Sequence, residues 1–103
     1  LFQGANRFNG DISEWNLIMA TNLNSMFDGA TIFNGDISKW NTLRVRSMDN
    51  MFRNAKQFTC DISGWNITSV YSMDGIFKGS AFDLNLVIEW ISPTVNNTYY
   101  FDI

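Results

Sequence analysis

The sequence predicts an α/β solenoid of four coils of 25 residues, each with one short strand and one short helix. The first observation is a six-residue block that recurs at a spacing of 25, as Asp11–Asn16, Asp36–Asn41 and Asp61–Asn66. Its tryptophan recurs once more, giving the column Trp15, Trp40, Trp65 and Trp90. The second observation is a phenylalanine column of the same period, at Phe2, Phe27, Phe52 and Phe77. A fixed period between about 20 and 50 residues is typical of a solenoid, in which no single unit buries its own apolar face.

A short helix is expected in each coil, because apolar residues lie three or four positions apart. In one coil these residues are Val45, Met48, Met51, Phe52, Ala55 and Phe58. The pattern predicts helices over 48–56 and near 23–31 and 73–80. The Asp-Ile-Ser-x-Trp segment that follows is expected to pair with its copies in a parallel ladder about 4.8 Å apart. One strand and one helix per unit is the plan of leucine-rich repeats.

The whole chain is predicted to be a single repeat domain. Its 103 residues divide into coils 1–25, 26–50, 51–75 and 76–103. The last coil diverges, because Asp-Ile-Ser is replaced there by Leu86-Val87-Ile88. The chain begins inside a repeat without an initiator methionine, so we expect it to be part of a longer protein.

The residue identities within the repeat are more specific than its period. The motif M-F-x-x-A-x-x-F-x-x-D-I-S-x-W-N, followed by a Val and a Met, resembles that of the BspA-type leucine-rich-repeat surface proteins over roughly residues 1–77. This resemblance implies a right-handed solenoid displayed outside the cell, with adhesion or protein binding as its role. It supplies no catalytic residues.

Composition argues against several classes of function. The net charge is −3 with only 7 Lys and Arg, which disfavours nucleic acid and anionic membrane surfaces as partners. No apolar run approaches the roughly 20 residues of a membrane span. The chain has no His, no nucleophile elbow, no phosphate-binding loop and no metal-ligand spacing, so we expect neither an enzyme nor a cofactor.

The repeated block places carboxylates in a column, at Asp11, Asp36 and Asp61. Stacked carboxylates repel one another unless backbone N–H groups or a cation compensate their charge. A calcium ladder is one interpretation. Turn capping is preferred, because too few other acids recur to complete the six or more oxygens that calcium takes.

Two further columns adjoin the carboxylates. Asn16, Asn41 and Asn66 are interpreted as an asparagine ladder that bonds the backbone of the neighbouring coil. The tryptophan column is a candidate platform for a linear glycan, but core packing beside the repeated isoleucines is the preferred interpretation. The sequons Asn66-Ile67-Thr68 and Asn96-Asn97-Thr98 make Asn66 and Asn96 candidate glycosylation sites, with Asn96 the better one.

Variable positions mark the expected surface. Adjacent coils should bring Glu14 beside Lys39 and Asp28 beside Arg53, which are weak pairs that help to fix coil order. Arg44, Arg46 and Arg53 form a modest basic patch. Cys60 cannot form an internal disulfide, because it is the only cysteine, and it is predicted to be a packed thiol.

These patterns favour a non-enzymatic extracellular or cell-surface module for adhesion or protein–protein interaction. The alternative is a structural subunit of an extracellular filament, assembled by end-to-end stacking. The partner is expected to be a protein or a neighbouring copy, with a glycan less favoured. The aromatic tail, residues 98–103, is predicted to cap the last coil rather than dock the next molecule.

Overall fold

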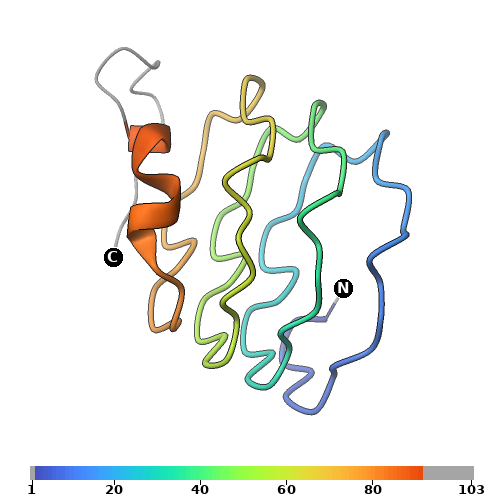
Figure 1. Ribbon diagram of the computed structural model, residues 1–103, viewed down its shortest axis with the longest axis vertical. Coiled ribbons are helices and arrows are strands. Elements are labelled where there is room, and N and C mark those ends of the chain that lie inside the picture. The colour runs from blue at the N-terminus through green and yellow to red at the C-terminus, as the bar shows by residue number, and fades with distance from the viewer. Residues whose placement is uncertain (1, 92–103) are drawn as a thin grey trace.

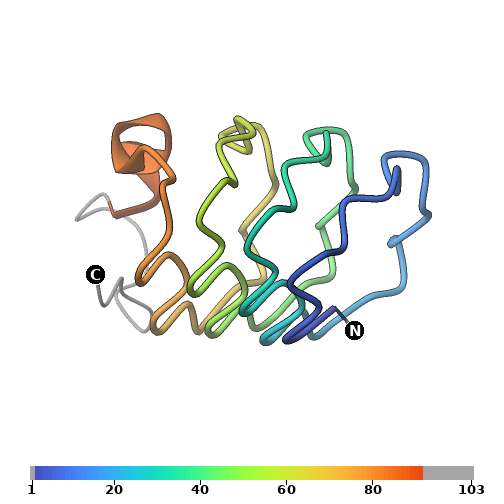
Figure 2. The same ribbon diagram turned by 90° about the horizontal axis from the view of Figure 1, so that it is seen from below.

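The computed structural model describes residues 2–91, and in it segments that are 25 residues apart lie side by side (Figure 1). We call these 25-residue segments layers, with layer 1 at 2–25, layer 2 at 26–50, layer 3 at 51–75 and layer 4 at 76–91. Figure 2 shows the same succession of layers from below. Layer 4 contains the 3₁₀ helix η1, Leu84–Ile91, which has a kink at Val87.

The predicted α/β leucine-rich-repeat-like solenoid, with a strand and a helix in each coil, is wrong. Among residues 2–91 the one helix is η1, and the segments 23–31, 48–56 and 73–80 are successions of turns. No strand forms in this part of the chain. Parallel pairing is confined to isolated bridges that join Asn22 to Ser47 and Ser47 to Ser72.

The turns form because successive N–H groups alternate between two kinds of acceptor. The N–H of Phe27 donates to the carbonyl of Met51 in the next layer at 2.8 Å. The following N–H, that of Asp28, donates to the carbonyl of Ser25 in its own layer at 3.2 Å. An α-helix needs every interior N–H to bond within its own segment. Here every second N–H leaves the segment, so the layers are joined and no helix can continue.

Left-handed backbone geometry recurs at two columns of these turns and also excludes a helix. One column comprises Ser25, Asn50 and Gly75, and the other comprises Gly4, Gly29, Asn54 and Gly79, all with positive φ. Glycine and asparagine adopt this region at the lowest cost. A turn whose third residue has positive φ, while its second does not, has the pattern of a type II turn. The bond from the Met26 N–H to the Leu23 carbonyl closes one such turn around Ser25.

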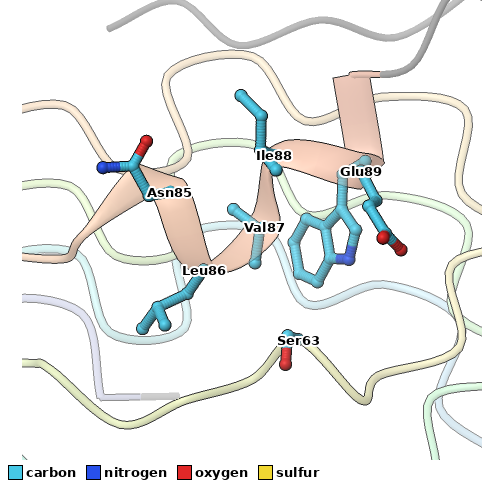
Figure 3. Close-up of a pocket in the computed structure, with 7 residues that line it drawn as sticks. Ser63, Asn85, Leu86, Val87, Ile88 and Glu89 are labelled. Atoms are coloured by element: carbon cyan, nitrogen blue, oxygen red, sulfur yellow. The ribbon is translucent and has the colours of Figure 1, made fainter.

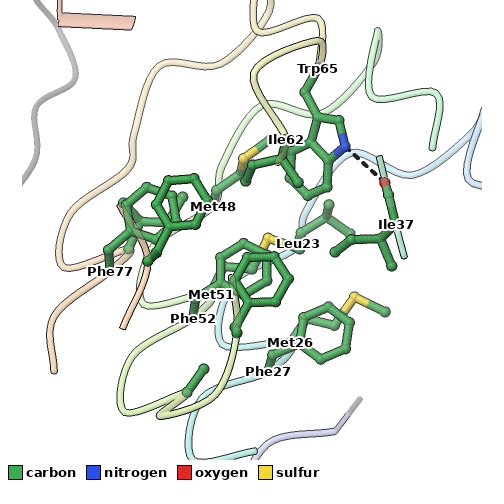
Figure 4. Close-up of a cluster of buried hydrophobic side chains, with 14 of the residues drawn as sticks. Leu23, Met26, Phe27, Ile37, Met48, Met51, Phe52, Ile62, Trp65 and Phe77 are labelled. Atoms are coloured by element: carbon green, nitrogen blue, oxygen red, sulfur yellow. Dashed lines mark hydrogen bonds between the residues drawn. The ribbon is translucent and has the colours of Figure 1, made fainter. Parts of the chain in front are cut away.

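Phenylalanine rings form the core between the layers (Figure 4). The ring centroids of Phe27 and Phe52 lie 5.5 Å apart, and those of Phe52 and Phe77 lie 5.7 Å apart. Within layer 3, Phe58 stacks on Phe52 at 4.1 Å. One continuous core therefore runs through all four layers.

Layer 4 keeps the buried columns although its backbone differs. Val87 and Trp90 on η1 are buried in the same core as Ile62 and Trp65, their counterparts 25 residues earlier. The divergent sequence therefore changes the backbone and keeps the packing. The predicted tail cap at 98–103 and the sequon at Asn96 lie outside the described residues.

Candidate functional site

The tryptophan column is part of the core in layers 2 to 4. Trp40 and Trp65 stack with ring centroids 6.3 Å apart and planes 8° apart. Each indole N–H donates at 3.0 Å to a carbonyl of the preceding layer, from Trp40 to Ile12 and from Trp65 to Ile37. Trp90 is buried as well, whereas Trp15 is 41% exposed. The column therefore does not present a row of indole faces on which a sugar chain could stack.

The carboxylate column caps turns within each layer. Oδ1 of Asp11, Asp36 and Asp61 accepts the backbone N–H of the serine two residues later, at 3.0, 3.0 and 2.9 Å. The serine hydroxyls also donate to Asp11 and Asp36. These hydrogen bonds favour the charged form and lower the pKa of all three carboxyls below the ordinary value of 3.8.

The same bonds occupy one oxygen of each carboxylate with protein donors rather than leaving it for a cation. Across residues 2–91 no three His, Cys, Asp or Glu side chains come together as metal ligands. The arrangement is that of a capped turn repeated in three layers.

The asparagine column after the tryptophans differs from the expected ladder. Oδ1 of Asn16, Asn41 and Asn66 accepts the N–H two residues later in its own layer, at 3.0, 3.0 and 2.9 Å. These asparagines therefore shape local turns and do not bond the backbone of a neighbouring layer. Asn66 is exposed, and the hydroxyl of Thr68 also donates to its Oδ1.

Two other polar columns bond between layers, and sequence reasoning missed both. Oδ1 of Asn24 accepts the N–H of Asp49 at 2.7 Å, and Oδ1 of Asp49 accepts the N–H of Asp74 at 2.8 Å. In the second column, Oδ1 of Asn34 accepts the N–H of Thr59 at 2.9 Å. The signal was present in the sequence as Asn or Asp at a fixed 25-residue spacing. The ladder was assigned instead to the asparagines that follow the tryptophans, because these belong to the longer repeated block.

Charge pairing between layers follows the prediction at one position. Arg53 and Asp28 form an ion pair with Nη2 3.1 Å from Oδ2, and Nε donates to the same carboxylate. Glu14 and Lys39 form no ion pair in the part of the chain that the structure describes.

Cys60 lies half-buried in the column of Gly10 and Gly35. Burial raises the pKa of its thiol, so the reactive thiolate is disfavoured. A Cβ at Gly35 would lie 2.8 Å from the edge of the Phe33 ring, which explains why this column takes small residues.

A small cavity separates η1 from layer 3 (Figure 3). Its volume is about 260 Å³, and it is lined by Ser63, Asn85, Leu86, Val87, Ile88, Glu89 and Trp90. The polar side chains of this lining are one carboxylate, one amide and one hydroxyl.

The most distinctive exposed surface is formed by three equivalent loops, 17–21, 42–46 and 67–71, which we call the arginine rim. They are the loops at the upper edge of Figure 1. Met19, Leu43 and Tyr71 are 71%, 45% and 56% exposed on it. Arg44 and Arg46 are also exposed, on either side of the buried Val45. The rim contains no Asp or Glu, although the whole chain carries a net charge of −3.

Backbone hydrogen bonds hold the loops of the arginine rim in register. The Arg46 N–H donates to the carbonyl of Thr21 at 2.8 Å, and the Tyr71 N–H donates to the carbonyl of Arg46 at 2.9 Å. One residue from each of three layers is thereby fixed in a row. The chemistry available on this row is apolar contact and recognition of anionic groups by arginine.

Residues 1–100 match the family model described as "Mycoplasma protein of unknown function, DUF285", and the chain belongs to that family. No curated protein and no solved structure matches it. Across the described residues no helix has the length and apolar character needed to cross a membrane.

Proposed function

We propose that this chain is a non-enzymatic, extracellular module of the BspA type that binds another protein through the arginine rim. The placement outside the cell rests on the resemblance of the repeated M-F-x-x-A-x-x-F-x-x-D-I-S-x-W-N motif to BspA-type surface proteins, and membership of the family is compatible with it.

The observation that carries the proposal is the composition of the rim. Large apolar side chains and arginines share an exposed surface there, and both kinds of residue are enriched where protein interfaces concentrate their binding energy. The scaffold below is held by bonds between layers, so little backbone order has to be gained on binding.

Site-specific photo-crosslinking on intact source cells tests this proposal. A photoreactive residue in place of Leu43 should give covalent adducts with an extracellular or surface-exposed protein. The same residue in place of Gln57, which is exposed outside the rim, is the matched control and should give none. Protease treatment of the intact cells should remove the adducts.

Two results would reject the proposal. Adducts at neither position would leave the rim without a protein partner, and adducts that survive protease on intact cells would place the module inside. The alternative function, a filament subunit, predicts instead that the purified chain sediments as polymers whose size grows with concentration.

A further inference from the structure

We infer that the partner segment held by the arginine rim is acidic. This inference rests on the proposed function and specifies the chemistry of its partner. It follows from two features of the rim: the sign of its charge and the small number of its cations.

Charge sets the first requirement on the partner. Arg44 and Arg46 are exposed and have no carboxylate partner in the described residues, unlike Arg53, which pairs with Asp28. Because the rim has no acidic residue of its own, an incoming carboxylate meets no like charge on these loops. Arginine binds carboxylates with paired, charge-assisted hydrogen bonds, so acidic side chains are the fitting ligands.

The number of cations argues against an anionic membrane surface and duplex DNA as partners. Recognition of an anionic membrane takes a cluster of about 4–8 Lys and Arg, and specific binding of duplex DNA commonly uses about 6–10 phosphate contacts. The rim offers two arginines on a chain whose net charge is −3. Two arginines match the few carboxylates of a short protein segment.

Fluorescence anisotropy with synthetic peptides tests this inference directly. The probe is a labelled peptide of about eight residues that alternates Asp with Leu, which more than spans three layers. The matched probe has Lys in place of each Asp. We expect saturable binding of the acidic probe that weakens as salt is added, and no binding of the basic one.

Charge reversal on the rim supplies the decisive comparison. Arg44→Glu with Arg46→Glu should weaken binding of the acidic probe by at least about tenfold, since each arginine contributes a charged hydrogen bond. Arg7→Glu with Lys56→Glu makes the same change in net charge at two exposed positions outside the rim and should leave binding unchanged. If charge reversal unfolds the rim, Arg44→Gln with Arg46→Gln gives the same comparison.

Several results would overturn the inference. Equal binding of the two peptides, or equal loss in the rim and control variants, would show that charge at the rim does not select the partner. Binding of anionic lipid vesicles through the arginines, without binding of the acidic peptide, would make the rim a membrane contact. Absence of peptide binding together with Leu43-specific protein adducts would reject the acidic segment and leave the proposed function standing.

Discussion

Layers 1 and 2 carry the same tryptophan at the same position, yet the two side chains have different surroundings. Trp40 in layer 2 is 4% exposed, and its indole N–H donates to the Ile12 carbonyl. Trp15 in layer 1 is 41% exposed, because no earlier layer lies against it within the described residues. The difference teaches that burial in this protein is supplied by the neighbouring layer and not by the local sequence.

The polar contacts, which either cross between layers or stay within one layer, support the same conclusion. Bonds between layers join Asn24 to Asp49 and Phe27 to Met51, whereas the bonds of Asn16 and Asp11 stay within one layer. We expect the first kind to contribute more to stability, because their loss leaves groups in the contact between layers unpaired.

The largest effect should come from the tryptophan column. Trp40→Ala should lower the free energy of unfolding by about 3–5 kcal/mol, because it leaves a cavity and removes one of the two hydrogen bonds that the Ile12 carbonyl accepts. Trp15→Ala should cost no more than about 1–2 kcal/mol, since the side chain is already partly exposed. Urea titration of both variants measures the difference, and equal losses would remove the distinction between the layers.

A smaller effect is expected from the polar column between layers. Asn24→Ala should cost about 2 kcal/mol, because its Oδ1 accepts both the Asp49 N–H and the hydroxyl of the buried Ser47. Asn16→Ala removes only a local turn bond at an exposed position and should cost about 0.5–1 kcal/mol. Thermal melts that place Asn16→Ala below Asn24→Ala would contradict the ranking.

Because of its backbone geometry, Gly29→Ala should lower the free energy of unfolding by about 1 kcal/mol. Its φ is +79°, and an added Cβ would make only ordinary contacts, so Gly29→Ala isolates the cost of the left-handed conformation. Gly64→Ala is the matched control, since a Cβ there meets nothing within 4 Å and φ is not left-handed. Differential scanning calorimetry should show a lower melting temperature for Gly29→Ala alone.

The smallest expected effect is on the pH dependence of stability. The pKa of Asp11, Asp36 and Asp61 is lowered by their serine partners, so the stability that they contribute is present above about pH 3.8 and is lost as the pH falls through the lowered values. An asparagine in each position can still accept the serine N–H but does not titrate. On acidification, the melting temperature of the triple Asp→Asn variant should therefore fall less than that of the parent. Equal falls in melting temperature would contradict the capping account.

The sequence allowed the period, the aromatic columns and the Asp28–Arg53 pair to be predicted, because each depends only on spacing. It misled on the backbone, since Met48, Met51, Phe52 and Ala55 have helical spacing. Successive four-residue turns place side chains three and four apart in the same way. The glycines and asparagines with positive φ, such as Gly29 and Asn54, were the sign of turns.

The candidate site was less predictable for a different reason. The exposed fractions of Met19, Leu43 and Tyr71 depend on which segments cover them, and equivalent positions in the three loops hold unlike residues. The repeat pattern is made of residues that recur, whereas the arginine rim is defined by side chains that do not recur.

The central claim is that residues 25 apart are neighbours, because this register holds both the core and the arginine rim. Disulfide trapping tests it most directly. Side chains of Asn34 and Thr59 are in contact, with Nδ2 3.2 Å from Oγ1. In a Cys60→Ser background, Asn34→Cys with Thr59→Cys should oxidise to an intramolecular disulfide in native conditions. The pair Asn34→Cys with Gln57→Cys, which is out of register, should stay reduced or form dimers. Efficient closure of the out-of-register pair, or failure of the first pair to close, would contradict the layered structure.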